Sequence, residues 1–207
     1  MPEITAITPQ KKDKTRCNIE IDGRFYCGMK LETVVKNRLK AGMTISEEAL
    51  SEMQLESEKM TALDKALTHI TATMKTEKDI RDFLKKKGYL EGVTDYVVEK
   101  MKGYSYLDDG AYAAAYAESA LKKGKGRRLI EAELKRKGVS DTNIQNSLDI
   151  LSKEEEEESA FQILEKYLRS KARDQKTYQK AYGYLLGKGF DYDTARAALE
   201  RVKREDD

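Results

Sequence analysis

The sequence is poor in the residue types on which most active sites and metal centres depend. Its 207 residues include one histidine, two cysteines, two prolines and no tryptophan. The histidine, His69, has no Cys, Asp or Glu three or four residues away, so it lacks helical partners for a catalytic triad or a metal cluster. The phosphate-binding patterns GxxxxGKS/T and GxGxxG are also absent. We therefore expect a protein that is not an enzyme and that holds no cofactor and no metal.

Long apolar runs are missing as well. No run approaches the roughly 18 apolar residues of a membrane-spanning helix, and the first residues, Met-Pro-Glu-Ile-Thr, lack the basic and then apolar pattern of a secretion signal. We expect a cytoplasmic protein with no membrane contact. Its 39 basic and 37 acidic residues make up 37% of the chain, against about 25% in an ordinary globular protein. So much charged surface favours a row of small modules over one compact sphere.

Both prolines, Pro2 and Pro9, lie at the N-terminus, where the pattern is that of β-structure. Alternating apolar residues on either side of Asp22-Gly23 predict a β-hairpin. A two-residue loop would put Phe25 on the face opposite Ile19, whereas a three-residue loop pairs these two residues and brings Cys17 opposite Cys27. We expect the three-residue loop, because it gathers the apolar set on one face. The cysteines could then form a disulfide, but two half-buried thiols are the expected state in a reducing cytosol.

Helical periodicity begins after the hairpin. A helix is predicted to end before Gly42, and one of its faces comprises Leu31, Val34, Val35, Arg38 and Leu39. A further helix is expected to start at Ser46, whose hydroxyl suits an N-cap.

Three internal repeats follow. The segments FLKKKGY (83–89), ELKRKGV (133–139) and YLLGKGF (184–190) share a Leu-x-x-Lys-Gly core, and their glycines are 50 and 51 residues apart. We expect Gly88, Gly138 and Gly189 to end three equivalent helices in the left-handed conformation. Apolar residues at helical spacing predict a further helix before and after each of these segments.

The repeats define the predicted fold class and domains. We expect an all-α protein of three tandem three-helix repeats, at residues 57–106, 107–152 and 153–207. A small N-terminal extension at residues 1–56, made of the β-hairpin and helices, precedes them.

The basic residues are clustered although the net charge is only +2. Five of them lie within seven residues, with no acidic residue from 119 to 130: Lys122, Lys123, Lys125, Arg127 and Arg128. The last two lie where a helix is expected to begin, and positive charge there opposes the helix dipole. Stability alone does not explain this loop, so we predict that it binds phosphate or an acidic partner.

Two further basic triplets close the first two repeated helices. They are Lys85, Lys86 and Lys87, and the equivalent Lys135, Arg136 and Lys137. Positive charge is favourable at a helix C-terminus and needs no partner there. The triplets can therefore be explained either by partner binding or by helix stability alone. Asp108 and Asp109 are expected to cap and charge the start of an Ala-rich helix. The acidic run from Glu154 to Glu158 is interpreted as a solvated helix start.

Three of these segments together resemble the RecX family, bacterial regulators of the RecA recombinase, over roughly residues 60–205. They are KTEKDIRDFLKKKGY (75–89), YLDDGAYAAAY (106–116) and GRRLIEAELKRKGV (126–139). The second segment contains the Leu-Asp-Asp helix start of that family, here Leu107–Asp109. The N-terminal extension is similar to that of the longer members from low-GC Gram-positive bacteria.

The resemblance implies a curved, elongated array of three-helix repeats that docks in the groove of a RecA filament on single-stranded DNA. It also implies inhibition of strand exchange and of RecA-stimulated repressor self-cleavage, and hence a role in homologous recombination, DNA repair and the SOS response. We expect a monomer that needs no cofactor. Direct DNA binding would be a weaker, additional contact.

A second class of function stays open from the sequence. A helical-repeat protein could bind single-stranded DNA without RecA, with lysines along the phosphates and bases stacked on tyrosines such as Tyr104, Tyr106 and Tyr112. The low net charge argues against strong DNA binding of this kind. The tyrosines fall partly at apolar helical positions, which favours core packing for them.

Overall fold

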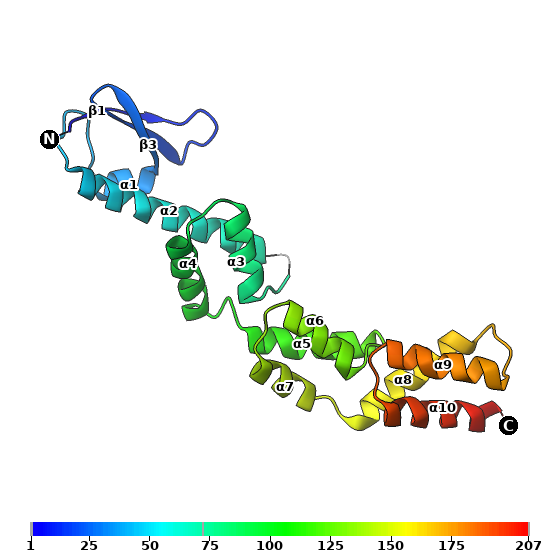
Figure 1. Cartoon of the computed structure of the whole chain (residues 1–207). Helices are drawn as coiled ribbons and strands as arrows, with labels where there is room; N and C mark the ends of the chain where they lie inside the picture. Colours follow the sequence, from blue (N-terminus) through cyan, green and yellow to red (C-terminus); the bar gives the residue numbers. More distant parts are fainter. Residues whose placement is uncertain (1, 72, 207) are drawn as a thin grey trace. The chain divides into compact units, whose positions relative to one another are not determined.

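The computed structural model of the chain describes residues 2–71 and 73–206, in two compact units (Figure 1). The first unit comprises Met1–Thr73 and Ile80–Tyr106, and the second comprises Met74–Asp79 and Leu107–Asp207. Strands occur only near the N-terminus of the described residues, and helices make up the regular structure after them. The expected fold class, helical repeats behind a small β-containing extension, is thereby confirmed. No helix in the described part of the chain is both long and apolar enough to cross a membrane.

The N-terminal extension is built on a three-stranded antiparallel sheet of order β1-β2-β3. Its strands are β1 (Ile4–Pro9), β2 (Arg16–Ile21) and β3 (Arg24–Lys30). Ile21 pairs with Arg24, so the hairpin loop contains only Asp22 and Gly23, with φ of +48° and +78°. Positive φ at both positions is typical of a type I′ turn. The prediction of a three-residue loop is therefore wrong.

A β-bulge explains why the shorter loop still buries the apolar residues. Glu20 pairs with Phe25, but Ile19 pairs with Cys27, so Tyr26 is an extra residue in β3. The bulge shifts the register by one residue and leaves Phe25 65% exposed, while Cys27 is buried on the same side as Ile19. Cys17 pairs with Met29 rather than with Cys27, and both cysteines are free and buried. The expected facing of the two cysteines is also wrong.

Two helices follow the sheet, α1 (Leu31–Lys36) and α2 (Glu47–Ile70). The first ends earlier than the apolar pattern predicts, because Arg38 adopts φ +52° and turns the chain so that Leu39 is buried. The second begins as expected, with the Ser46 hydroxyl accepting a hydrogen bond from the Ala49 N–H at 3.2 Å. Helix α2 continues through residues 56 and 57, where we expected the extension to give way to the first repeat.

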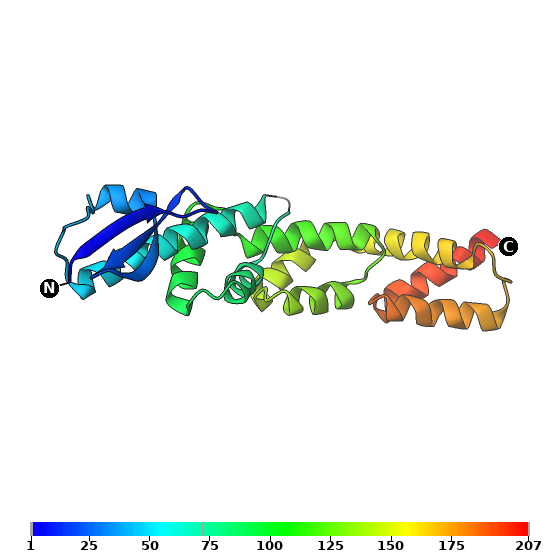
Figure 2. The ribbon, with the colours of Figure 1, turned by 90° about the horizontal axis from the view of Figure 1, so that it is seen from above.

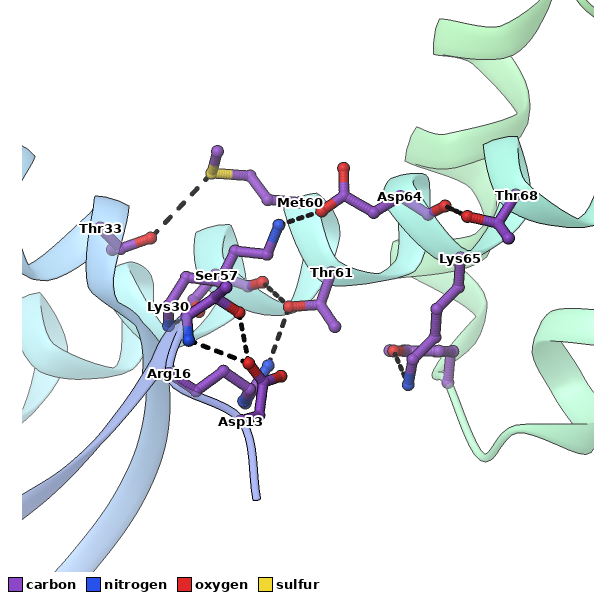
Figure 3. A network of polar contacts seen from close by, with 12 residues as sticks. Asp13, Arg16, Lys30, Thr33, Ser57, Met60, Thr61, Asp64, Lys65 and Thr68 are labelled. Carbon is purple, nitrogen blue, oxygen red and sulfur yellow. Dashed lines mark hydrogen bonds and ion pairs between the residues drawn. The ribbon is translucent and has the colours of Figure 1, made fainter. Parts of the chain in front are cut away.

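A polar network fixes the sheet on α2 (Figure 3). The Arg16 guanidinium donates a hydrogen bond to the Thr61 hydroxyl at 2.9 Å. The backbone N–H of Lys30 donates to the buried Ser57 hydroxyl at 2.6 Å, and the Lys30 ammonium pairs with Asp64. Arg16 and Lys30 are paired at one end of the β2–β3 ladder, so that end is tied to α2.

The remaining helices form the three repeats. They are α3 (Glu77–Lys86), α4 (Glu91–Gly103), α5 (Asp109–Lys122), α6 (Arg127–Arg136), α7 (Asp141–Asp149), α8 (Lys153–Leu168), α9 (Gln175–Gly187) and α10 (Tyr192–Asp206). The same packing recurs in each repeat, with α2 against α4, α5 against α7, and α8 against α10. In the second unit, Figure 2 shows α8 continuing from the end of α5, with α9 and α10 alongside. One apolar core runs through both repeats of this unit, from Ala113 to Val202.

The three glycines end equivalent helices, as predicted. Gly88, Gly138 and Gly189 have φ of +85°, +79° and +89°. After each, the chain closes a hydrogen bond back into the helix, as from the Tyr89 N–H to the Leu84 carbonyl at 3.2 Å. This is the pattern of a Schellman C-cap.

Candidate partner-binding surface

The basic loop at residues 122–128 is a joint between the second and third repeats. The Gly126 N–H donates to the Lys188 carbonyl at 2.9 Å, and the Arg128 N–H donates to the Gly189 carbonyl at 3.1 Å. A Cβ atom on Gly126 would lie only 2.2 Å from the backbone nitrogen of Phe190. Only glycine permits so close an approach of two backbones. The loop is therefore held in place by its neighbours and is not a free surface segment.

Arg127 points into this joint. Its Nη2 donates to the Leu151 carbonyl at 2.6 Å, and its Nε pairs with the carboxylate of Glu156 on α8. The Glu156 side chain is only 5% exposed. Burial raises the pKa of Glu156, although the hydrogen bond and positive charge of Arg127 act in the opposite direction. The acidic run from Glu154 to Glu158 was expected to be solvated throughout, and for Glu156 that expectation is wrong.

Lys125 is also committed to a contact within the fold. Its ammonium lies 2.8 Å from both carboxylate oxygens of Glu133, and the Tyr116 hydroxyl donates to the same carboxylate at 2.5 Å. The hydrogen bond to Glu133 raises the pKa of Lys125. Burial acts to raise the pKa of Glu133, but the hydrogen bonds from Lys125 and Tyr116 outweigh it and the pKa is lowered. This cluster fastens the loop to α5 and α6.

Three cations of the loop remain on the outside. Lys122 and Lys123 are exposed at the end of α5, and neither has an ion-pair partner among the described residues. Arg128 is exposed, with its guanidinium carbon 5.4 Å from the centre of the Tyr192 ring. We call Lys122, Lys123 and Arg128 the outer cations. They are the part of the predicted binding loop that a partner can reach.

The triplet at the end of α6 lies away from the loop. A helix of ten residues is about 15 Å long, and α6 separates the loop at its start from Lys135–Lys137 at its end. Lys135 pairs with Glu131 at 2.8 Å and Lys137 with Asp79 at 3.1 Å, which raises the pKa of Lys137. Arg136 is exposed, with no ion pair among the residues the structure describes.

The other triplet, Lys85–Lys87, belongs to the first unit. Lys85 and Lys86 are exposed in the last turn of α3 and have no ion-pair partner in the described part of the chain. The Lys87 ammonium lies 5.7 Å from the centre of the Phe83 ring. The same ring stacks on His69 at 4.1 Å, which gives the single histidine a packing role.

The Leu-Asp-Asp segment serves helix starts. Leu107 is buried, and the Asp108 carboxylate accepts hydrogen bonds from the N–H groups of Gly110 and Ala111, both at 2.9 Å. Asp109 accepts from the Glu77 N–H at 2.8 Å and so also satisfies the first turn of α3. The capping prediction is confirmed for Asp108, and Asp109 extends it to a second helix.

The tyrosines considered for base stacking divide into two groups. Tyr112 is partly buried against the core and stacks on Tyr116 at 6.0 Å. Tyr104 and Tyr106 are 61% and 54% exposed. Only the second pair is available to a partner.

Glu156 is the residue that the sequence interpretation missed. The helical period could have indicated that Glu156 is buried, because it lies four residues before Ala160 and continues the buried stripe of Ala160, Leu164 and Leu168. No group of three or more His, Cys, Asp or Glu side chains in the described chain is placed to hold a metal ion.

Family models match four stretches that together make up most of the chain. Residues 2–46 match the regulatory protein RecX N-terminal domain. Residues 62–101, 108–148 and 154–199 match the first, second and third three-helix domains of RecX.

Individual relatives agree with these matches. Regulatory protein RecX of Bacillus licheniformis is 34% identical over 210 residues, which cover 100% of this chain and 80% of that protein. The protein of the same name from Clostridium perfringens is 34% identical over 206 residues, covering 98% and 97%. A crystal structure of a regulatory protein RecX superposes with a TM-score of 0.74 at 26% identity, covering 97% of this chain and 100% of that chain. RecX from Lactobacillus salivarius shares the fold over 70% of this chain, with a TM-score of 0.65 at 21% identity.

Proposed function

Because the chain belongs to the RecX family of regulatory proteins, we propose that it regulates the RecA recombinase without chemistry of its own. In this proposal it binds in the groove of RecA filaments on single-stranded DNA, as a monomer in the cytoplasm. It thereby inhibits the recombinase, ATPase and coprotease activities of RecA and modulates the SOS response. The repeats at residues 57–106, 107–152 and 153–207 supply the contacts.

The outer cations are the observation that supports this function best. They are exposed on a loop whose backbone is held by Gly126 and whose inner side chains, Lys125 and Arg127, are already paired. A partner therefore meets charges on a fixed backbone and does not have to order the loop on binding, which favours affinity. Positive charges suit the acidic side chains of a protein groove or the phosphates of the DNA within it.

Exposed cations at equivalent positions of other repeats extend this proposed binding surface. Lys85 and Lys86 on α3, and Arg136 on α6, are further exposed cations at equivalent helix ends. Contacts of this kind are weak individually, but contacts on one chain to successive protomers of a filament strengthen one another through effective concentration. A repeat protein with clustered charges and low net charge can use such a mode, whereas tight binding to bare DNA needs a larger net positive charge.

The test is a triple substitution, Lys122→Gln, Lys123→Gln and Arg128→Gln, assayed by inhibition of RecA ATPase on single-stranded DNA. At roughly 0.5 kcal/mol for each exposed charge, three contacts amount to about a tenfold loss of affinity. The inhibitor concentration for half effect should rise about tenfold, and its dependence on salt should become flatter. Replacing Lys166, Lys176 and Lys180 by Gln removes the same charge elsewhere in the second unit and should change little. Equal inhibition by wild type and both variants would refute the role of the outer cations.

Binding to single-stranded DNA without RecA is the second candidate, and exposed Tyr104 and Tyr106 favour it. Base stacking on an aromatic side chain contributes about 1–3 kcal/mol. If this candidate is correct, fluorescence anisotropy will show DNA binding by the isolated protein, and replacing both tyrosines by Ala will weaken it at least tenfold. Inhibition of RecA that survives the same change would favour the first candidate.

A further inference from the structure

A groove in the second unit includes the outer cation Lys122 at its edge, but its lining is otherwise apolar and acidic. It has a volume of about 620 Å³ and lies where the end of α5 meets the corner between α7 and α8. Its apolar lining is formed by Leu121, Ile150 and Leu151. Leu121 and Leu151 are buried, whereas Ile150 is 58% exposed. Ile150 lines the groove with the two buried leucines, so the three side chains together give it an apolar lining that an apolar group of a partner can contact.

The polar residues around this lining are mainly acidic. Four glutamates contribute to the groove, Glu118, Glu154, Glu155 and Glu158, against the single cation Lys122. Glu155 caps α8, and Glu158 pairs with Arg201 at 2.7 Å. Among the described residues, Glu118 and Glu154 have no ion-pair partner. The groove therefore presents negative charge that the fold itself does not neutralise.

The walls of the groove are fixed by hydrogen bonds. The Ser159 hydroxyl donates to the Leu121 carbonyl at 2.6 Å, which ties α8 to the end of α5. Arg127 holds the Leu151 carbonyl from the other side. Ser152 and Glu155 form a complete capping box at the start of α8. A site whose backbone is fixed in this way loses little conformational entropy on binding.

We propose that this groove binds a segment of the recombinase in which an aliphatic side chain is flanked by lysine or arginine. The aliphatic group would contact Ile150, and the cations would face Glu118 and Glu154. The inference rests on the proposed function for the identity of the partner. Its chemistry rests on the groove alone, because an acidic rim repels the phosphates of DNA and attracts a basic protein segment. The groove and the two outer cations that do not line it, Lys123 and Arg128, would then contact surfaces of opposite charge, which fixes the orientation of the bound chain.

Two groove variants and two matched controls test this proposal on the full-length chain, with affinity measured for RecA filaments on single-stranded DNA. Ile150→Ser removes the exposed aliphatic group, and Leu90→Ser makes the same kind of change at a 72% exposed leucine of the first unit. The double variant Glu118→Lys/Glu154→Lys reverses the rim charge, and Glu99→Lys/Glu200→Lys reverses two exposed charges outside the groove. Both groove variants should lose about tenfold in affinity, while both controls should stay within twofold of wild type.

The possible outcomes separate this inference from the proposed function. If wild type binds the filament and the groove variants bind equally well, the groove assignment is wrong and the proposed function stands. If wild type does not bind the filament, both fail. A photo-crosslinking residue at position 150 gives an independent readout, which supports the inference only if it captures a recombinase segment rich in Lys or Arg. Capture of a second copy of this chain, with self-association on gel filtration, would instead overturn it.

Discussion

Replacing Arg127 by Met should destabilise the second unit by about 3 kcal/mol near neutral pH. The variant leaves the Glu156 carboxylate buried without its partner, since that side chain is only 5% exposed. Removing one member of a buried pair typically costs about 3–5 kcal/mol. Glu156 can limit this cost by taking up a proton, at about 1.4 kcal/mol for each pH unit above its ordinary pKa of 4.5. Between pH 4.5 and about pH 7 this limit is at most about 3.4 kcal/mol, and it is smaller relative to wild type because the pKa of Glu156 is already raised there. The expected cost of Arg127→Met therefore lies near the lower end of the range of about 3–5 kcal/mol.

Because protonation of Glu156 limits the cost of Arg127→Met, this cost should decrease as the pH is lowered. Near pH 5 the same limit falls below about 1 kcal/mol, so the variant should approach wild type as the solution becomes more acidic. Urea denaturation, followed by circular dichroism and by hydrogen exchange at amides of α8, measures the difference at each pH. The exposed pairs that Lys135 makes with Glu131 and Asp141 serve as the control, and Lys135→Met should cost no more than about 1 kcal/mol at every pH tested.

A double variant separates loss of the pair from loss of packing. Glu156→Gln keeps a group that can accept a hydrogen bond from Arg127 and removes the buried charge. In the background of Arg127→Met it should recover about 2 kcal/mol of stability near pH 7, because no unpaired charge is then buried. A cost below 1 kcal/mol for Arg127→Met, a cost that does not change with pH, or no recovery in the double variant would each refute this reasoning.

Two further predictions concern the same joint. Gly126→Ala places a Cβ atom 2.2 Å from the Phe190 backbone nitrogen, so it should lower the free energy of unfolding, measured by urea denaturation, by at least about 2 kcal/mol. The control is Gly187→Ala, because a Cβ atom at this helical position meets open space. This variant should instead raise the free energy of unfolding by about 0.5–1 kcal/mol. For Glu156 itself, burial raises the pKa in the folded chain, so the folded state binds more protons above the ordinary pKa of 4.5, and the free energy of unfolding decreases as pH rises through that window. Glu156→Gln lacks this loss and should be more stable relative to wild type at about pH 7 than at about pH 4, whereas the opposite trend would contradict the direction of the shift.

Local sequence rules predicted the helix ends and the repeats because the physical causes are local. Gly88, Gly138 and Gly189 adopt positive φ, which glycine tolerates without steric cost, and the hydrogen bonds that follow them lie within one turn. Ser46 and Asp108 satisfy N–H groups two or three residues away. Each of these contacts can be recognised from a window of a few residues.

The errors have causes that lie outside such a window. Strict alternation predicted the hairpin loop wrongly, because the bulge at Tyr26 corrects the register that a two-residue loop would otherwise break. The basic loop was interpreted as one surface, but Lys125 and Arg127 find their partners 8 and 29 residues away. Charge clustering shows that cations are present and does not show which of them the fold neutralises.

The joint therefore links the stability of the second unit to its proposed binding surface. In repeat proteins each module packs mainly on its neighbours, so the contacts at one joint set the orientation of the modules that follow. Here the same loop carries Lys122 and Lys123 on the side of the second repeat and Arg128 beside Tyr192 of the third. Arg127, between them, holds the Leu151 carbonyl that forms part of the acidic groove. Loosening Arg127 would change the spacing between the outer cations and the groove without removing any residue that we expect a partner to contact.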